Sequence, residues 1–264
     1  MDVKIFLQNL YKFYSELYSG LVKPAKPLIR LGAVNDGGYL LPDDLSGLKY
    51  CLSPGVADTA DFEMDCATKY GMDVYMCDHT IDASPLEHPL FHFEKMGIGY
   101  GINVNAMMQP MSAWAKKCSI PQDSELIVQM DIEGAEYDFF LLENPEFFSR
   151  CRYIIMEMHY LHQMLQPMYF ESRLLPFINA INKYFDIIHI HPNNHTVFVQ
   201  FGGLNITSCL ELTLGRRDLN KKTSPLMSYN LYPRHPLDAP NMPDKPEVEL
   251  PDLKILREFI NSIP

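Results

Sequence analysis

The stretch Ser124–Asp138, which reads SELIVQMDIEGAEYD, indicates the fold class of this chain. Residues 126–130 are mostly apolar and partly β-branched, which is typical of a strand buried on both faces. The run ends at Asp131, and Glu133 and Glu136 follow. A buried strand followed directly by carboxylates places charge at the carboxyl end of a sheet, where open α/β sheets bind ligands. The same acids also suit the first turn of an ordinary helix, so this stretch alone allows a functional and a structural interpretation.

Two segments before this stretch predict a strand–helix–strand unit. Residues 49–56 are expected to form a strand that ends at Ser53-Pro54-Gly55, and a helix should follow from Thr59, its expected N-cap, to about residue 70. Residues 73–78 predict a second strand that ends in Asp78. In nucleotide-binding sheets an acid at this place accepts hydrogen bonds from ribose hydroxyls. The loop after the first strand has a single glycine, so the GxGxxG fingerprint is missing.

The rest of the chain continues this alternation. We expect helices over residues 2–19, 111–118, 136–143, 161–185 and 252–260, strands over 97–104, 152–158, 185–190, 196–201 and 209–214, and a loop over 79–93. Asp36-Gly37-Gly38 predicts the turn of a hairpin, and residues 139–142 are expected to pack inward. Alternating strands and helices predict an α/β fold with a mostly parallel sheet and helices on both faces.

Right-handed crossovers bring the carboxyl ends of such strands to one edge of the sheet. That edge is expected to gather polar residues from distant segments, namely Ser53, Gly55, Asp78, Asp131, Glu133, Glu157, His159, His191, Asn193, Asn194 and His195. A purely structural sheet does not need polar residues at the ends of so many strands. The functional interpretation is therefore favoured.

The composition limits the classes of partner. The chain has 264 residues, 47% of them hydrophobic, and a formal net charge of −11. This length suffices for one large α/β domain or two small ones. The negative charge argues against nucleic acid as the main partner, because binding a phosphate backbone requires clustered Lys and Arg. We see no signal peptide at the N-terminus and no apolar stretch of about 18 residues, so no membrane span is expected.

The six cysteines stand apart from one another and form no CxxC pair. A zinc ribbon is therefore not expected. Cysteines inside apolar runs are typical of proteins in a reducing compartment, and we expect a cytoplasmic location.

Several of these motifs resemble those of the FkbM-type S-adenosylmethionine-dependent methyltransferases, in particular the subgroup with an Asp-Gly-Gly-Tyr motif. The similar positions are Arg30-x-Gly32, Asp36-Gly-Gly-Tyr39, Ser53-x-Gly55-Val56, Phe62-Glu63, Asp78, Asp131-Ile-Glu-Gly-Ala-Glu136, Glu157-x-His159, His191-x-Asn193-Asn194 and Glu211-Leu-Thr. The resemblance spans residues 28–215. One departure is Gln129, because many members carry Lys at that position.

The resemblance implies a Rossmann-like class I methyltransferase fold with a seven-stranded sheet, S-adenosylmethionine as cofactor, and O-methylation of a small-molecule or glycan acceptor. It implies cofactor-binding roles for Arg30, Asp36, Tyr39, Ser53, Gly55, Glu63, Asp78, Asn105 and Asp131. Arg30 would pair with the carboxylate of the cofactor, Asp78 would hold its ribose, and Asn105 would lie near the adenine. The alternative for Asn105 is a loop asparagine that makes only local turns.

An acceptor hydroxyl has a high pKa and has to be activated. The residues leave two routes open. Either His159 or His191 acts as a general base beside Asp131, or Asp131, Glu157 and His159 ligate Mg²⁺ or Mn²⁺. The structural alternative for His159 is a satisfied core histidine.

The organisation along the chain predicts an N-terminal helix and linker over residues 1–27, a methyltransferase domain over 28–222 and a Pro-rich C-terminal extension over 223–264. The extension is expected to wrap the domain or to join a partner chain, which leaves a homo-oligomer open. Two other functions also stay open: a non-catalytic binding module on this fold, and an NAD(P)-dependent oxidoreductase, against which the missing GxGxxG motif counts.

Overall fold

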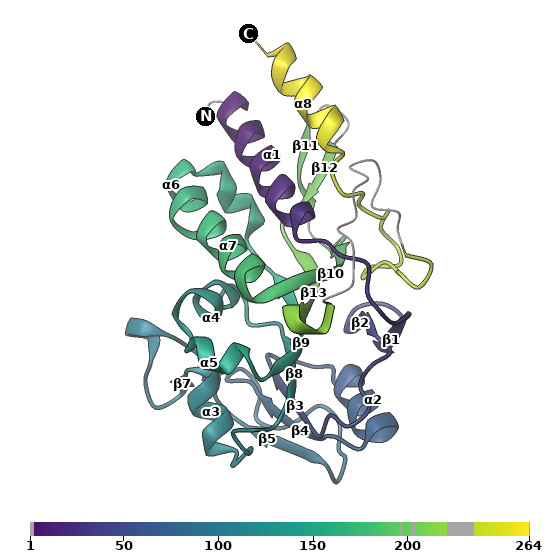
Figure 1. The fold of residues 1–264 in the computed structure, drawn as a ribbon, viewed down its shortest axis with the longest axis vertical. Helices are drawn as coiled ribbons and strands as arrows, with labels where there is room; N and C mark the ends of the chain where they lie inside the picture. Colours follow the sequence, from purple (N-terminus) through teal and green to yellow (C-terminus); the bar gives the residue numbers. More distant parts are fainter. Residues whose placement is uncertain (1–2, 196, 202–203, 221–234, 264) are drawn as a thin grey trace.

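A computed structural model describes residues 3–195, 197–201, 204–220 and 235–263 of the chain. Its centre is a seven-stranded sheet with the order β10-β13-β9-β8-β3-β4-β5 (Figure 1). The strands are β3 (Tyr50–Pro54), β4 (Asp73–Cys77), β5 (Phe91–Glu94), β8 (Leu126–Met130), β9 (Cys151–Met158), β10 (Phe185–Pro192) and β13 (Leu210–Arg216). All neighbours pair in parallel except β13, which is antiparallel to both β9 and β10.

This order and these directions are those of a Rossmann-like class I methyltransferase fold. The chain first builds the sheet from β3 outward to β5, then restarts at β8 and builds in the other direction. The last strand inserts itself between β9 and β10. The predicted fold class is confirmed.

Strand β8 shows why an almost continuous apolar run was the right signal. Leu126, Val128 and Met130 belong to one core cluster, and Ile127 belongs to the cluster on the opposite face. Since side chains alternate along a strand, both faces of β8 are covered.

Helices cover both faces of the sheet. They are α1 (Val3–Ser19), α2 (Asp61–Tyr70), α3 (Met111–Lys117), α4 (Glu136–Leu142), α5 (Pro145–Phe148), α6 (Pro167–Tyr169), α7 (Leu175–Tyr184) and α8 (Leu253–Ser262). The 3₁₀-helices are η1 (Gly101–Asn103), η2 (Leu161–Leu165) and η4 (Arg217–Asn220), and η3 (Phe170–Leu174) is a π-helix. One face packs against α2 and the hairpin β1 (Leu28–Gly32)–β2 (Gly38–Pro42), and the other against most of the remaining helices. Helices α1 and α8 lie side by side, with both termini at that end (Figure 1).

Four sequence-based expectations about local structure were wrong. The region 79–93 was expected to be a loop, but it ends in edge strand β5, whose partly exposed FHFE sequence lacks a core signal. The strand expected over 97–104 is limited to β6 (Gly97–Ile98), which pairs with β7 (Met108–Gln109) outside the main sheet. The N-cap of α2 is Ala60 in place of Thr59. Leu142, expected to pack inward, is exposed.

The strand expected over 196–201 corresponds to β11 (Val197–Phe201). It pairs with β12 (Leu204–Thr207) in a separate hairpin, and residue 196 lies outside the described residues. The domain boundaries at residues 27 and 222 stay a prediction, and the second of them also lies outside the described residues.

Residues 235–251, which we call the C-terminal segment, run back along the carboxyl end of β10 and the amino end of the antiparallel β13. Asn35 donates a hydrogen bond to the carbonyl of Pro240 (2.8 Å), and Asn194 donates one to that of Met242 (3.0 Å). Within the described part of the chain, no helix has both the length and the apolar character that crossing a membrane requires.

Candidate functional site

A small cavity lies where the strand order reverses between β3 and β8. Its volume is about 130 Å³, and it is lined by Asp36, Gly37, Tyr39, Gly55, Val56, Ala57, Asp58, Thr59, Phe62, Glu63, Gln129, Asp131 and Glu157. In open α/β sheets ligands bind at such a switch point, outside the carboxyl ends of the strands. The cavity therefore stands where the sequence predicted a site.

Gly55 allows the loop after β3 to approach the end of β8. Its φ of +84° lies in the left-handed region, and a Cβ atom built on it would overlap the carbonyl oxygen of Asp131. The Gly55 amide donates to the carbonyl of Cys77 (2.8 Å), and the Asp131 amide donates to that of Pro54 (3.2 Å). These bonds hold the two loops together at the floor of the cavity.

A chain of uncharged hydrogen bonds forms one wall. Ser53 Oγ contacts Glu63 Oε1 and lies 2.7 Å from Gln129 Oε1. Gln129 Nε2 donates to the hydroxyl of Tyr39 (3.3 Å), which donates to Glu157 Oε1 (3.0 Å). Ser53 has a single proton for two acceptors, so a protonated Glu63 completes the network. Burial raises the pKa of Glu63 to about 7, although its hydrogen bond with Ser53 lowers it.

The variant Glu63→Gln is expected to remove a pH dependence of stability. The unfolded chain loses this proton near the ordinary pKa of 4.5, and the folded chain loses it only near 7, so the stabilisation is complete below pH 4.5 and is lost above 7. At pH 8 the unfolding free energy of the variant should be higher than that of the native protein by about 3 kcal/mol. Urea unfolding at pH 4.5 and 8 measures this, with Glu87→Gln as an exposed control. An equal difference at both pH values would contradict the assignment.

Asp78 fixes the far side of the same loop. Its carboxylate accepts hydrogen bonds from the amide of Ala57 (3.0 Å) and from the amide and hydroxyl of Thr80 (2.7 and 2.6 Å). Burial opposes ionisation, but these hydrogen bonds hold the pKa of Asp78 below its ordinary value. An ionised acceptor thus stands directly behind Ala57, which lines the cavity.

Asp131 and His159 come together at the end of β8 and β9. His159 Nε2 lies 3.5 Å from Asp131 Oδ1, and its Nδ1 lies 3.1 Å from Oε1 of the fully buried Glu136. Burial raises the pKa of Asp131 to about 7, against the effect of His159. Burial lowers the pKa of His159, but the hydrogen bond and charge of Glu136, with Asp131 and Glu133, raise it to about 9. Asp131 lines the cavity and Glu136 orients the imidazole from behind.

A row of titratable residues crosses four neighbouring strands at this edge. His191 is the cross-strand partner of Glu211, and Glu211 is the partner of Glu157. Asp131 continues the row on the side of β8. It directly follows Met130, and the cross-strand partner of Met130 is the residue before Glu157. Burial raises the pKa of Glu157 well above its usual range, and the charges of Asp131 and Glu211 add to this.

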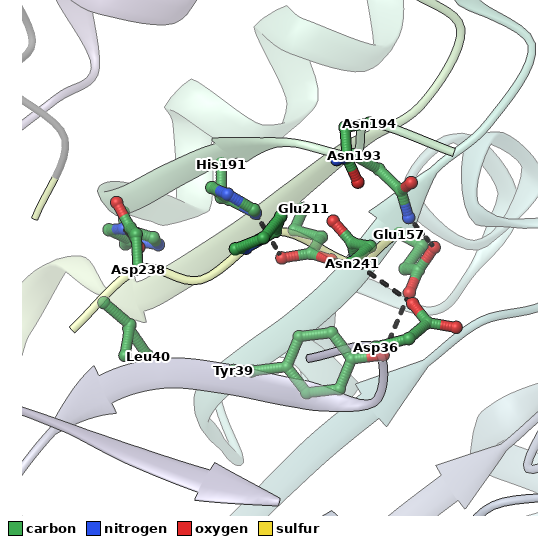
Figure 2. A network of polar contacts seen from close by, with 12 residues as sticks. Asp36, Tyr39, Leu40, Glu157, His191, Asn193, Asn194, Glu211, Asp238 and Asn241 are labelled. Carbon is green, nitrogen blue, oxygen red and sulfur yellow. Dashed lines mark hydrogen bonds and ion pairs between the residues drawn. The ribbon is translucent and has the colours of Figure 1, made fainter. Parts of the chain in front are cut away.

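His191 does not line the cavity. Its Nδ1 lies 3.0 Å from Glu211 Oε2 (Figure 2). Its Nε2 lies 3.6 Å from Glu247 Oε2 of the C-terminal segment. We therefore do not retain His191 as the candidate base.

Two predicted cofactor residues have other partners. The guanidinium of Arg30 donates to the carbonyls of Ala33 (2.8 Å), Asn35 (2.8 Å) and Leu237 (3.4 Å), so it shapes the hairpin loop. Asn105 bonds to Asn103 and Met107 within an exposed loop and does not line the cavity. These contacts agree with the local-turn interpretation, and a place of Asn105 near the adenine stays a prediction.

Sequence reasoning missed two site residues. Glu136 was named among the acids after the strand and as a motif residue, but its contact with His159 was not predicted, because 23 positions separate the two residues in the chain. Asn241 lies in the Pro-rich extension, where no periodicity points to a role. It contacts Asp36 and Glu211 in the structure (Figure 2).

Three groups of described side chains are close enough to share a metal ion: Asp131, Glu133 and His159; Glu157, His159 and Cys209; and Asp36, Glu157 and Glu211. The predicted set of Asp131, Glu157 and His159 overlaps with all three. His159 Nε2 lies 3.5 Å from Asp131 and 4.0 Å from Glu157, so His159 stands between the two acids. A metal at this set stays a prediction.

Comparisons with known proteins add little. No protein-family model matches the chain, and no curated protein matches it. Among solved structures, the chain is similar to one described as "Human methyltransferase 10 domain containing protein", with 11% identity, a TM-score of 0.33, and coverage of 81% of this chain and 83% of that chain.

Proposed function

We propose that this protein is an S-adenosylmethionine-dependent O-methyltransferase that methylates a hydroxyl of a sugar or glycan-related acceptor. The observation that carries the proposal is the acid-lined cavity at the switch point of a sheet with class I methyltransferase strand order. The motif resemblance to the FkbM-type enzymes supports the choice of acceptor.

The charge of the cavity suits this cofactor. S-adenosylmethionine supplies an electrophilic methyl group on a positively charged sulfonium, beside an ammonium group. The lining carries Asp36, Asp58 and Asp131, together with the protonated Glu63 and with Glu157, and it contains no Lys or Arg among the described residues. At about 130 Å³ the cavity is smaller than the roughly 300–1,000 Å³ of sites that enclose a whole drug-sized ligand. It would therefore enclose only part of the cofactor.

The residues around the cavity divide the remaining tasks. The backbone of Gly55–Ala57 would approach the cofactor, and Asp78 would accept hydrogen bonds from its ribose. Asp131 would take the proton of the acceptor hydroxyl. At the same time the hydroxyl oxygen of the acceptor attacks the methyl carbon, and the bond between this carbon and the sulfur of the cofactor breaks. A pKa of about 7 suits a base that works near neutral pH. His159, held by Glu136, is the positioning residue that orients Asp131.

Calorimetry with S-adenosylhomocysteine tests the cofactor class. We expect binding to the native protein, and about tenfold weaker binding to Asp78→Asn, because the amide replaces one acceptor and disturbs the bond to Ala57. Asp82→Asn, an exposed acid, is the matched control.

Absence of binding to the native protein would overturn the proposal. Binding of NAD⁺ in its place would favour the oxidoreductase alternative. Binding of S-adenosylhomocysteine with no methyl transfer across a broad sugar panel would favour the non-catalytic module.

A further inference from the structure

Two buried carboxylates face each other in the central sheet. Glu157 on β9 and Glu211 on β13 are direct cross-strand partners, and only 6% and 7% of their surfaces are exposed. Like charges directly opposite each other destabilise a sheet, and burial adds the cost of removing them from water. Asp36, from the loop between β1 and β2, approaches the same pair. Carboxylate oxygens of all three acids lie within 4.8 Å of one another.

Side chains of neighbouring segments contact two of the three acids. Tyr39 and Asn193 donate to Glu157 (3.0 and 3.3 Å), and His191 contacts Glu211 (3.0 Å). In the described part of the chain, no Lys or Arg side chain forms an ion pair with any of the three acids. The nearest basic partners among the described residues are two histidines, His191 at Glu211 and His159, whose Nε2 lies 4.0 Å from Glu157 Oε2.

A fourth side chain is directed at the cluster from the C-terminal segment. Asn241 is 4% exposed, and its Nδ2 donates to Asp36 Oδ1 (3.0 Å) and to Glu211 Oε1. Its Oδ1 is buried and has no hydrogen-bond partner among the described residues. Rotating the amide by half a turn exchanges the two atoms and directs Oδ1 at the carboxylates. That orientation is favourable only if a cation lies between the oxygens.

We propose that Asp36, Glu157, Glu211 and the amide oxygen of Asn241 bind a hard divalent cation. An all-oxygen set of carboxylates and an amide is the donor chemistry of Mg²⁺, Mn²⁺ and Ca²⁺. Figure 2 shows the four side chains converging from the hairpin loop, two sheet strands and the C-terminal segment. The cation would fasten that segment across the edge of the sheet, beside the bonds that Asn35 and Asn194 already make to it.

Cation binding can be measured without cofactor or turnover, so its failure and the failure of the proposed function are distinguishable. The full-length protein is freed of metal with EDTA, which is then removed, and is titrated with MnCl₂ while free Mn²⁺ is followed by electron paramagnetic resonance. We expect binding of one Mn²⁺ per chain, and competition by CaCl₂ or MgCl₂. Glu211→Gln removes one charged ligand and should weaken binding by about tenfold or more.

The variant Asn241→Asp separates a ligand from a structural hydrogen-bond donor. A fourth carboxylate adds repulsion without metal, so the melting temperature in EDTA should fall, and Mn²⁺ should restore it with tighter binding than in the native protein. Glu143→Gln is the matched control for Glu211→Gln, because Glu143 is as buried as Glu211 but bonds to Tyr100 and Ser112. Near-ultraviolet circular dichroism in EDTA shows which variants are folded.

Asp131→Asn distinguishes this site from the neighbouring set around His159. It should leave the Mn²⁺ affinity unchanged. The proposal is overturned if the native protein binds no Mn²⁺, if Glu211→Gln binds as tightly as the native protein, or if Asp131→Asn abolishes binding while Glu211→Gln does not. Should Asn241→Asp fail to fold, Glu211→Gln and Asp131→Asn still decide.

Discussion

Replacing Asp131 with Asn is expected to slow methyl transfer by about 10²- to 10⁴-fold, the usual contribution of a general base. The Asn side chain keeps the size of Asp131 but cannot accept the proton of the acceptor hydroxyl. Affinity for S-adenosylhomocysteine should change by less than about tenfold, because the loops held by Gly55 and Asp78 stay in place. Transfer of radiolabelled methyl from S-adenosylmethionine to the best acceptor of a sugar panel measures the rate.

A double mutant shows whether His159 acts through Asp131. His159→Gln alone should lower the rate by a smaller factor, since Asp131 loses its orientation but keeps its carboxylate. Residues that act as one unit have non-additive effects, so adding His159→Gln to Asp131→Asn should cause no further loss. His92→Gln, on the exposed side of β5, serves as the control. Multiplying effects in the double mutant, or a normal rate in Asp131→Asn, would rule out this division of roles.

Gly55→Ala is expected to unfold the cavity floor and to abolish cofactor binding. The methyl group would overlap the carbonyl oxygen of Asp131, and the backbone at φ +84° is itself unfavourable for Ala. Since neither loop can withdraw without breaking the bonds between β3, β4 and β8, we expect a loss of about 3 kcal/mol or more in unfolding free energy. Chemical denaturation measures the stability, and calorimetry measures the binding of S-adenosylhomocysteine.

Gly47→Ala isolates the steric part of this effect. Gly47 has nearly the same φ, +85°, but a Cβ atom there would meet nothing within 4 Å. The variant Gly47→Ala should lower the unfolding free energy only by the backbone strain of about 1–2 kcal/mol, and it should leave cofactor binding intact. Equal stability of the two variants would show that the approach of the loops does not matter.

The sequence predicted the central architecture well because burial on both faces leaves a strong signal. The apolar runs of β8 and β9 are typical of inner strands. The ends of these runs correctly predicted that Asp131, Glu157 and His159 lie near one another. The edge strand β5 was missed for the opposite reason, since a strand covered on one side only can carry exposed and polar residues.

The finer roles depended on contacts that no local pattern encodes. Arg30 was expected to pair with the carboxylate of the cofactor, which stays a prediction, and its donors contact three carbonyls, one of them more than 200 positions away in the chain. Asn241 reaches the acids through a Pro-rich extension whose path follows from tertiary packing alone. Asp36 and Glu211 were noted as motif residues, but only the register between β9 and β13 shows that Glu211 faces Glu157.

The insertion of β13 between β9 and β10 has a consequence for how the protein is made. During synthesis β10 emerges from the ribosome before β13, the strand that connects it to the rest of the sheet. Strand β10 therefore has no partner in the main sheet until residue 216 has left the ribosomal tunnel. Until then β9 presents an unpaired edge, which is a template for association with other chains. Folding of this half of the molecule therefore waits for its latest strand, and chains that stop short of it would be candidates for chaperone capture or degradation.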